Sequence, residues 1–299
     1  MTKPVVVGLD GSRESLAAAD WGARAALHRD LLLRLIHAWE GAPGLGTAEI
    51  LQHGRCVPQY WARRTLRGAL EVITERYPQV YVSAEQVHKP PREALLSEAA
   101  SAELLVLGNA GLSGVGSLLT GSVALTIISH ATVPVVLVRA GWSAAADRSP
   151  EGGPTSLRTP YRDTVVAVDP SRSCDGLLAF AFDEAARRGT ALHAVHIWHL
   201  PYSTSNTPAS SVHSRAQDAA VAALDEQLQP WRDKYPVVPV HATAVHARSA
   251  HEIVHAARDA GLLVVGRRPR RIGLGPHTGP VTHTVIHHVG CPVAVVPHD

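Results

Sequence analysis

Short apolar runs alternate along the chain with longer segments in which apolar residues recur every three to four positions. In the first half the apolar runs are Pro4 to Leu9, Leu31 to Ala38, Val80 to His88, Leu104 to Gly108 and Val133 to Arg139. Uninterrupted runs of this length are typical of strands buried on both faces of a parallel sheet. The pattern predicts the order βαβαβαβαβ in this half of the chain.

The segment between the second and third predicted strands has one apolar helical face. Its apolar residues are Ala62, Leu66, Leu70, Ile73 and Tyr77. The second half repeats this spacing with Ala220, Leu224, Leu228, Trp231 and Tyr235. Such spacing places side chains on one side of a helix, so the two halves are predicted to pack a long helix in the same way.

The two halves align at a shift of 159 residues near their starts and 158 residues further on. The matched stretches are Val5 to Ser12 with Thr164 to Ser171, Ile36 to Trp39 with Val195 to Trp198, Arg76 to Pro78 with Lys234 to Pro236, Leu104 to Gly108 with Leu262 to Gly266, and Val133 to Val136 with Cys291 to Ala294. This many matches in the same order indicate a duplication.

Residues 141–159 are rich in Ala, Ser, Pro and Gly and have no apolar period, which is typical of a solvated linker. The sequence therefore predicts one domain over 1–140, a linker over 141–159 and a second domain over 160–299. Right-handed crossovers give each domain an open, doubly wound, parallel five-stranded sheet of the Rossmann-like α/β class. Ligands of such sheets bind beyond the carboxyl ends of the strands.

Composition narrows the classes of partner. The chain has 299 residues, 45% hydrophobic residues and a formal net charge of +2. Without long blocks of one charge sign, neither a nucleic acid nor a membrane is favoured as the main partner. The first residues lack a targeting pattern and the apolar runs are strand-sized, so we expect a cytoplasmic protein. Cys56, Cys174 and Cys291 form no CxxC pair, and buried or inert thiols are expected.

A Gly-rich loop follows the fourth predicted strand. Gly108-Asn109-Ala110-Gly111 is followed by nine residues and then by Gly121-Ser122, which opens a helical segment. Glycines let the backbone approach a ligand, and the amides and dipole of a helix start attract phosphate oxygens. The P-loop signature is not met because no Lys precedes Ser122, and no GxGxxG follows the first strand. A Gly-rich loop alone is equally compatible with a structural turn.

This loop resembles that of the universal stress protein family, whose ATP-binding members carry GxxG, nine residues, and then Gly followed by Ser or Thr. Gly108, Gly111, Gly121 and Ser122 match this spacing without a gap. The likeness extends over nearly the whole chain, twice, and it also covers Asp10-Gly11-Ser12, His37-Ala38-Trp39 and Pro134-Val135-Val136.

The resemblance implies an adenine-nucleotide alpha-hydrolase-like fold that binds ATP, with Mg²⁺ as the accompanying ion. It places Asp10 against ribose and adenine, the backbone of Ala38 against the base, and the loop over 108–122 around the phosphates. The implied nucleotide-binding residues are Gly8, Asp10, Gly11, Ala38, Gly108, Asn109, Gly111, Gly121, Ser122 and Val123. From the residues alone, Asp10 is also suited to cap the helix that follows it, and the two roles are compatible.

The C-terminal copy departs from this pattern. Pro269 and Pro280 replace the second Gly and the Ser, and proline has no amide hydrogen to donate. We therefore expect this half to bind ATP poorly or not at all. Its loop holds four arginines, whereas the loop over 108–122 has no Lys or Arg; they are Arg267, Arg268, Arg270 and Arg271. They form a solvated basic loop, or else they help to neutralise a phosphate in this chain or across an oligomer.

His251-Glu252-Ile253-Val254-His255 is a literal HExxH, the spacing of a zinc site with a general base. It aligns with Glu93 to Ser97 in the other half, where no zinc pattern exists, and no further histidine ligand follows it. The chain has 18 histidines, which makes a chance match easy. We therefore predict no metal site in this stretch, and we interpret His283, His287 and His288 as ordinary helix histidines.

The leading hypothesis is a regulatory protein of the stress response, in which ATP sets the conformation or association of the molecule. The resemblance implies that the last strands, Val133 to Arg139 and Pro292 to Pro297, pair the halves as an intramolecular pseudo-dimer or pair two chains as a homodimer. Two alternatives stay open. One is a slow nucleotide hydrolase, for which no acid, base or nucleophile set is evident. The other is a ligand-free interaction protein in which both loops are structural.

Overall fold

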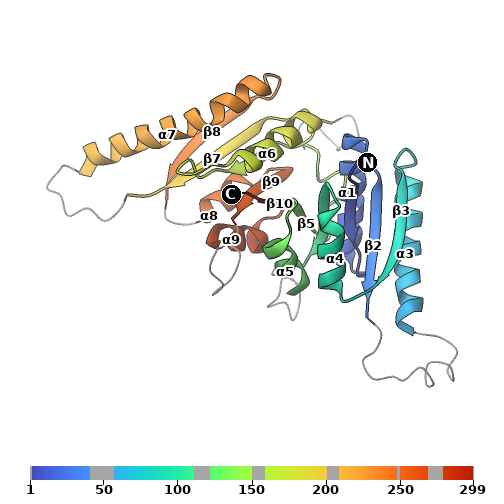
Figure 1. The fold of residues 1–299 in the computed structure, drawn as a ribbon. Helices are drawn as coiled ribbons and strands as arrows, with labels where there is room; N and C mark the ends of the chain where they lie inside the picture. The colour runs from blue at the N-terminus through green and yellow to red at the C-terminus, as the bar shows by residue number, and fades with distance from the viewer. Residues whose placement is uncertain are drawn as a thin grey trace. The chain divides into compact units, whose positions relative to one another are not determined.

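The computed structural model describes residues 2–40, 57–110, 122–149, 159–200, 209–247, 250–268 and 279–298. They form two compact units, Met1–Ala144 and Ala145–Asp299. Figure 1 colours the first from blue to green and the second from green-yellow to red. In each unit parallel strands form a sheet with helices on both faces, which confirms the doubly wound α/β class predicted from the sequence.

The strands of unit 1 lie in the order β3-β2-β1-β4-β5. Their bounds are β1 (Val5–Gly8), β2 (Leu33–Trp39), β3 (Val82–His88), β4 (Leu104–Asn109) and β5 (Val135–Arg139). Val5 of the central strand pairs with Leu33 on one side and with Leu104 on the other. The strand order therefore reverses between β1 and β4, and the carboxyl ends of these strands form the crevice in which such sheets bind ligands.

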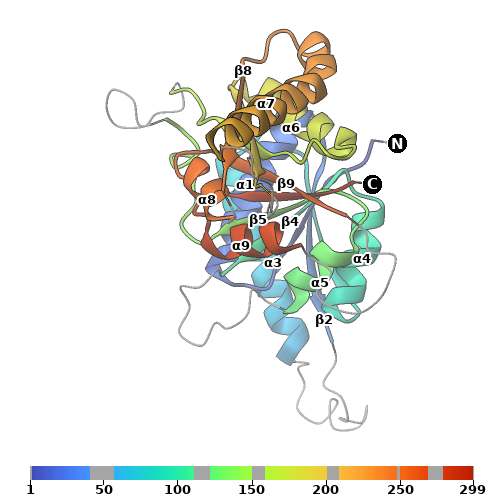
Figure 2. The same ribbon diagram turned by 90° about the vertical axis from the view of Figure 1, so that its left-hand side faces the viewer.

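Helices cover both faces of this sheet (Figure 2). On one face α1 (Arg13–Arg29) packs over β1, β4 and β5, while α3 (Val57–Arg76) packs over β2 and β3. On the other face α4 (Pro91–Ala100) and α5 (Ser122–His130) contact each other. The predicted apolar face of α3 is confirmed, because Ala62, Leu66 and Ile73 are buried.

Unit 2 repeats this topology with the order β8-β7-β6-β9-β10. The strands are β6 (Thr164–Ala167), β7 (Leu192–Trp198), β8 (Val240–His246), β9 (Leu262–Arg267) and β10 (Val293–Pro297). The helices are α6 (Asp175–Arg188), α7 (Ala209–Lys234), α8 (His251–Ala256) and α9 (Pro280–His288). Helix α9 begins at a proline, whose nitrogen needs no hydrogen-bond partner in the first turn.

Burial follows the place of each strand in its sheet. The side chains of Val5, Val6 and Val7 in the central strand β1 are fully buried, because helices lie over both faces. The edge strands β3 and β8 are half-buried or exposed along their length. The more polar runs over 82–88 and 240–246 therefore mark these two edges, whereas β5 and β10, at the other ends of the two strand orders, are apolar and buried.

Part of the segment predicted as a solvated linker is packed into unit 2. Asp147 is 1% exposed, and its Oδ1 lies 3.7 Å from Nη1 of Arg188. The guanidinium of Arg148 lies 3.5 Å from the ring centroid of Tyr161. The expectation of a solvated segment is therefore wrong for Asp147 and Arg148, because a buried ion pair and an aromatic ring give them fixed partners. Residues 150–158 lie outside the described part of the chain.

Candidate functional site

A pocket of about 330 Å³ opens in unit 1 at the carboxyl ends of β1, β2 and β4. The first turn of α1, α4 and the start of α5 complete its walls. The lining residues are Gly8, Leu9, Asp10, Ser12, Glu14, Ser15, Ile36, Ala38, Pro91, Leu95, Leu107, Gly108, Ala110, Val123 and Ala124. The pocket therefore lies at the point where the strand order reverses, which is where the topology places a ligand.

Asp10 is held at the rim of this pocket by the turn that it begins. Its Oδ1 accepts hydrogen bonds from the backbone nitrogen of Ser12 at 2.9 Å and from Ser12 Oγ at 2.5 Å. Burial acts to raise the pKa of Asp10, but the hydrogen bonds from Ser12, together with one from Ser15, hold this pKa below its ordinary value. The carboxylate is therefore ionised at neutral pH and fixed in position.

Ser12, and not Asp10, caps helix α1. Ser12 Oγ accepts a hydrogen bond from the backbone nitrogen of Ser15 at 3.1 Å, and Ser15 Oγ donates to the Ser12 carbonyl at 2.9 Å. This arrangement satisfies one of the amides that a helix start leaves without an internal partner. Asp10 supports the cap by fixing Ser12, so its structural role and its place in the pocket coexist.

Gly108 is required by a close approach between β4 and α1. A Cβ atom at this position would lie 2.6 Å from the backbone nitrogen of Ser15 and 2.7 Å from the carbonyl carbon of Glu14. Backbone atoms in a first helical turn cannot move aside as the end of a flexible side chain can. The first glycine of the Gly-rich loop therefore has a packing reason that is independent of any ligand.

The pocket has two chemically different sides. Ile36 and Ala38, at alternate positions of β2, form an apolar wall with Leu95 of α4 and Leu107 of β4. The other side carries the carboxylates of Asp10 and Glu14, and none of the described lining residues is Lys, Arg or His. The site thus offers apolar contact to a flat group and hydrogen-bond acceptors to hydroxyl groups, but no described cation for an anionic group.

His37 serves the structure of the β2 end. Its Nδ1 lies 2.8 Å from the Leu9 carbonyl oxygen, and in unit 2 Nδ1 of His196 lies 3.0 Å from the Val168 carbonyl oxygen. A carbonyl oxygen only accepts, so Nδ1 carries the proton in both cases. The repeated His-x-Trp motif thus ties the second strand of each unit to the end of its first strand.

The structure brings together part of the predicted site. Five predicted residues line the pocket: Gly8, Asp10, Ala38, Gly108 and Val123. Gly11 and Asn109 are not among the lining residues; Gly11 has a φ of +86° and faces Thr65, and Asn109 is buried. Gly111 and Gly121 lie outside the described residues, and so does the side chain of Ser122.

Sequence reasoning missed several lining residues. Pro91 and Leu95 come from the helix after the third strand, and Glu14 and Ser15 come from the first turn of α1. The α1 residues follow directly on the recognised Asp10 turn, so the rule that ligands bind at strand ends was a signal for them. Pro91 and Leu95 carry no motif, and only the packing of α4 beside β2 and β1 places them in the pocket.

The corresponding region of unit 2 has the same turn, but an arginine side chain of the same unit lies against it. Asp169 Oδ1 accepts hydrogen bonds from the Ser171 nitrogen at 3.2 Å and from Ser171 Oγ at 2.6 Å. However, Arg268, which aligns with Ala110, places Nη1 3.7 Å from Asp169 Oδ2. Burial acts to raise the pKa of Asp169, but the Ser171 hydrogen bonds and the Arg268 charge bring it below its ordinary value.

Other side chains also fill this region of unit 2. A Cβ atom on Gly266 would collide with the imidazole of His298, whereas the equivalent Gly108 meets helix backbone. Arg267 is 7% exposed, and burial lowers its pKa. The hypothesis that Arg267 and Arg268 neutralise a phosphate elsewhere is therefore not supported, because one is buried and the other is paired inside its own unit. Arg270 and Arg271 lie outside the described residues.

One histidine of the HExxH stretch, His251, contacts another histidine of unit 2. His251 and His255 lie in the six-residue helix α8, and the His251 ring lies 5.5 Å from that of His288 between centroids. Within the described ranges, no three side chains of His, Cys, Asp or Glu come together in a way that could hold a metal ion. Cys174 and Cys291 are free and buried, and burial raises the pKa of the Cys291 thiol to about 12.

Comparison with known proteins resolves the family. Residues 1–139 and residues 160–297 each match the model of the universal stress protein family. The chain belongs to the universal stress protein family. Two matches in one chain make it a tandem universal stress protein, in agreement with the repeated topology of the two units.

Relatives of similar length match nearly the whole chain. A universal stress protein of Mycobacterium tuberculosis is 31% identical over 310 residues, which cover 99% of this chain and 99% of the relative. A crystal structure of a universal stress protein from Archaeoglobus fulgidus covers 99% of this chain and 96% of its own, with a TM-score of 0.69 and 15% identity, and this likeness shows the fold. A shorter universal stress protein in complex with cAMP is 28% identical, covers 46% of this chain and 98% of its own, and has a TM-score of 0.36.

Crossing a membrane requires a helix that is both long and apolar. None of the described helices meets both conditions.

Proposed function

We propose that the pocket of unit 1 binds an adenine nucleotide and that this universal stress protein acts as a nucleotide-dependent regulatory protein of the stress response. The observation that carries the proposal is the pairing of a fixed, ionised Asp10 with an apolar wall at the reversal point of the sheet. A carboxylate accepts hydrogen bonds from ribose hydroxyls, and the wall of Ile36 and Ala38 suits the face of a base.

ATP with Mg²⁺ is the proposed form of the ligand. By the family likeness, Gly111, Gly121 and Ser122 hold the phosphates, next to a helix whose first residue is Ser122. The described lining of the pocket contains two carboxylates, those of Asp10 and Glu14, and no cationic side chain. A divalent cation lowers the repulsion between these groups and a polyphosphate, which supports a requirement for Mg²⁺.

The same likeness supports a proposal about association. We propose that the last strands of the two units, β5 and β10, are the edges through which domains pair. Pairing within the chain gives an intramolecular pseudo-dimer, and pairing between chains gives a homodimer. Nucleotide-dependent association is then the route from ligand to regulation. Light scattering after size exclusion, with and without ATP and Mg²⁺, measures the association state directly.

Mass spectrometry of small molecules released from gently purified protein tests the proposed ligand. An adenine nucleotide in the wild type and its loss in Gly111→Glu support the proposal, because a carboxylate in the loop repels phosphate. The matched control is Gly68→Glu, which adds the same charge in α3 at a position where an added Cβ atom meets no other part of the fold within 4 Å. Absence of nucleotide, together with no thermal shift by ATP, AMP or cAMP with Mg²⁺, overturns it, because a ligand that binds the native state must stabilise it.

A further inference from the structure

Two histidines on the outer side of α9 lie one helical turn apart. Val285 and Ile286, on the inner side of this helix, are fully buried. His283 is exposed and His287 is half-buried. Residues four positions apart are neighbours on one side of a helix, so the backbone itself brings these two imidazoles together at the surface.

The separation of the two rings fits two ligands of one metal ion. The ring centroids of His283 and His287 lie 4.6 Å apart, with 54° between the ring planes. A metal ion about 2.0–2.1 Å from an imidazole nitrogen lies about 3.2 Å from the ring centroid. Two imidazoles bound at about 90° then have centroids about 4.5 Å apart, whereas a tetrahedral angle places them about 5.2 Å apart. Spacing alone makes these residues ordinary helix histidines, and the ring separation adds that they are placed for ligands at a right angle.

The inner side of α9 is anchored, so the pair stays at the surface. Thr282 Oγ1 donates a hydrogen bond of 3.1 Å to the carbonyl oxygen of Gly266 in β9. The helix also packs against α8, β9 and β10 (Figure 1). Among the described residues, no third side chain of His, Cys, Asp or Glu joins the pair as a ligand. Water therefore has access to complete the coordination of a bound ion.

Two other histidine pairs of unit 2 differ from this one. The ring centroids of His251 and His288 lie 5.5 Å apart, which is longer than either separation expected for two ligands of one ion. His213 and His246 also have centroids 4.6 Å apart, but both rings pack against Trp198, at 5.3 and 4.6 Å. The pair on α9 thus combines the suitable separation with a fixed spacing on one helix.

Unit 1 has no equivalent pair at the aligned positions of α5. Leu125 aligns with His283, and Ser129 aligns with His287. Ser129 Oγ donates a hydrogen bond of 2.7 Å to the Leu125 carbonyl oxygen, so this serine serves its own helix. The duplicated framework therefore carries the pair once, which predicts one bound ion per chain.

We propose that His283 and His287 form a binding site for one Cu²⁺ or Ni²⁺ ion on the surface of unit 2. Both ions take nitrogen ligands at right angles, in square-planar or tetragonal geometry. Zn²⁺ is disfavoured, because its tetrahedral preference requires the wider separation. The site goes beyond nucleotide binding, and it links the stability of α9 to the metal ion, since an ion that binds the helical arrangement stabilises it.

Calorimetric titration of the full chain with Cu²⁺, on protein produced without a His tag, tests this site. The chain has 18 histidines, so weaker binding elsewhere is expected beside one site of highest affinity. His283→Asn and His287→Asn should each lower the affinity of that site at least about tenfold, because each leaves one imidazole in place of two linked ligands. The double variant should lose little more, since either single variant already breaks the chelate.

His288→Asn is the matched control, because it removes a histidine of the same helix that contacts His251 instead. His213→Asn tests the other pair with the same separation. Both should keep the wild-type affinity for Cu²⁺, and thermal unfolding without metal checks that every variant is folded. The EPR spectrum of bound Cu²⁺ should show two imidazole nitrogens in the wild type.

Four results would overturn the proposal. The first is a wild-type affinity for Cu²⁺ no higher than that of the double variant. The second is additive losses in the two single variants, which indicate independent histidines. The third is an equal loss in His288→Asn or His213→Asn, which moves the site elsewhere. The fourth is tighter binding of Zn²⁺ than of Cu²⁺, which contradicts the right-angle geometry.

Discussion

Arg268 forms an ion pair with Asp169 at the place where unit 1 leaves Asp10 facing an open pocket. Arg268 Nη1 lies 3.7 Å from Asp169 Oδ2. The aligned position in unit 1 is Ala110, which lines the pocket and carries no charge. The difference between Ala110 and Arg268 therefore leaves the Asp10 carboxylate available to a ligand, whereas the Asp169 carboxylate is neutralised by its own chain.

This difference predicts one nucleotide per chain. Isothermal titration calorimetry with ATP and Mg²⁺ should give one site rather than two, because Arg268 engages Asp169 and Pro280 supplies no amide hydrogen at the start of α9. An arginine at the aligned position of unit 1 should weaken binding there as well. Ala110→Arg is expected to lower nucleotide affinity at least about tenfold, since the new guanidinium competes for Asp10.

Val72→Arg is the control for Ala110→Arg, because Val72 is 46% exposed on α3 and does not line the pocket. It adds the same charge to unit 1 and should leave the affinity unchanged. Two equivalents of nucleotide bound per wild-type chain would contradict the prediction that the Arg268–Asp169 ion pair prevents binding in unit 2. Unchanged affinity in Ala110→Arg would contradict the proposed role of this position.

The sequence predicted the framework because the framework depends on local patterns. The runs listed for the first half correspond to its five strands, and the internal repeat extended the same order of elements to the second half. The pocket was predicted only in part, because several of its walls depend on packing between distant segments. Leu95 of α4 meets Gly8 of β1 through the packing of the helix on the sheet, and no motif in the sequence marks that contact.

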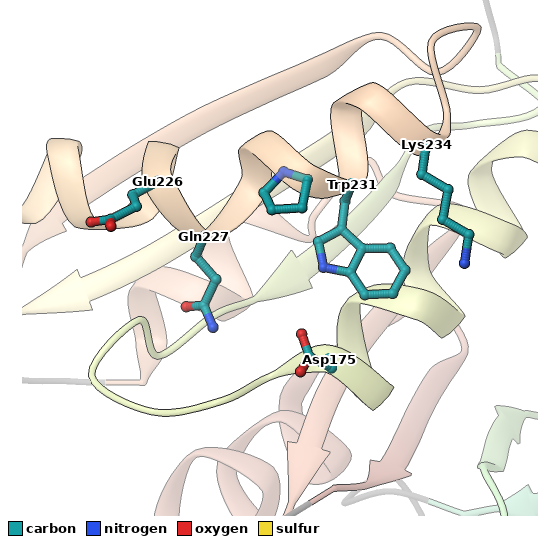
Figure 3. Close-up of a pocket in the computed structure, with 6 residues that line it drawn as sticks. Asp175, Glu226, Gln227, Trp231 and Lys234 are labelled. Atoms are coloured by element: carbon teal, nitrogen blue, oxygen red, sulfur yellow. The ribbon is translucent and has the colours of Figure 1, made fainter.

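Equal spacing also concealed a difference between the halves. Ile73 and Trp231 occupy the same position of the same apolar pattern, and the pattern predicts both as core residues. Ile73 is 1% exposed, whereas Trp231 is half-buried and lines a hollow together with the polar Gln227 and Asp175 (Figure 3). Periodicity identifies which face of a helix turns inward, but the chemistry opposite that face decides whether the space is closed.

Asp10→Asn should weaken nucleotide binding about tenfold, because the amide keeps one acceptor oxygen and loses the charge that strengthens hydrogen bonds from ribose hydroxyls. Asp169→Asn is the matched control, since Asp169 makes the same two hydrogen bonds with Ser171 in unit 2. It should not alter nucleotide affinity. Calorimetry measures both affinities. Equal losses of nucleotide affinity in Asp10→Asn and Asp169→Asn would contradict a direct contact between Asp10 and the nucleotide.

The same Asp10 variant has a predicted pH dependence of stability. The folded-state pKa of Asp10 lies below its ordinary value of 3.8, so the ionised carboxylate stabilises the fold above about pH 4 and this contribution is lost as the pH falls through the folded-state pKa. Thermal unfolding should therefore show a lower midpoint for Asp10→Asn than for the wild type at pH 7. The difference should shrink as the pH falls below 3.8, and a difference that stays constant with pH would contradict a stabilising role of the Asp10 charge.

Glu14→Gln should reduce the dependence of nucleotide binding on Mg²⁺. Glu14 lines the pocket beside Asp10, and removing its charge lowers the repulsion of phosphate. We expect ATP affinity in EDTA to rise about two- to fivefold, as fits a partly exposed charge at short range. Affinity with Mg²⁺ should change less. A fall in ATP affinity in EDTA would instead indicate that the Glu14 carboxylate accepts a hydrogen bond from the nucleotide.

Gly108→Ala should destabilise unit 1 by about 1–3 kcal/mol, because the new methyl group overlaps the backbone of α1 at Ser15 and Glu14. The appropriate comparison is Gly68→Ala in α3, where the added Cβ atom meets nothing within 4 Å. That variant should stabilise the fold by about 0.5–1 kcal/mol, since alanine loses less backbone entropy in a helix than glycine.

The two glycine variants separate packing from ligand binding when denaturant unfolding is measured without nucleotide. A destabilised Gly108→Ala under these conditions shows that the first glycine of the loop serves the contact between β4 and α1. Unchanged stability together with lost nucleotide affinity would instead assign this glycine to the ligand. We expect Gly108→Ala to be destabilised, because the added methyl group would overlap backbone atoms that cannot easily move. The glycine of the loop motif would then be required for packing as well as for binding.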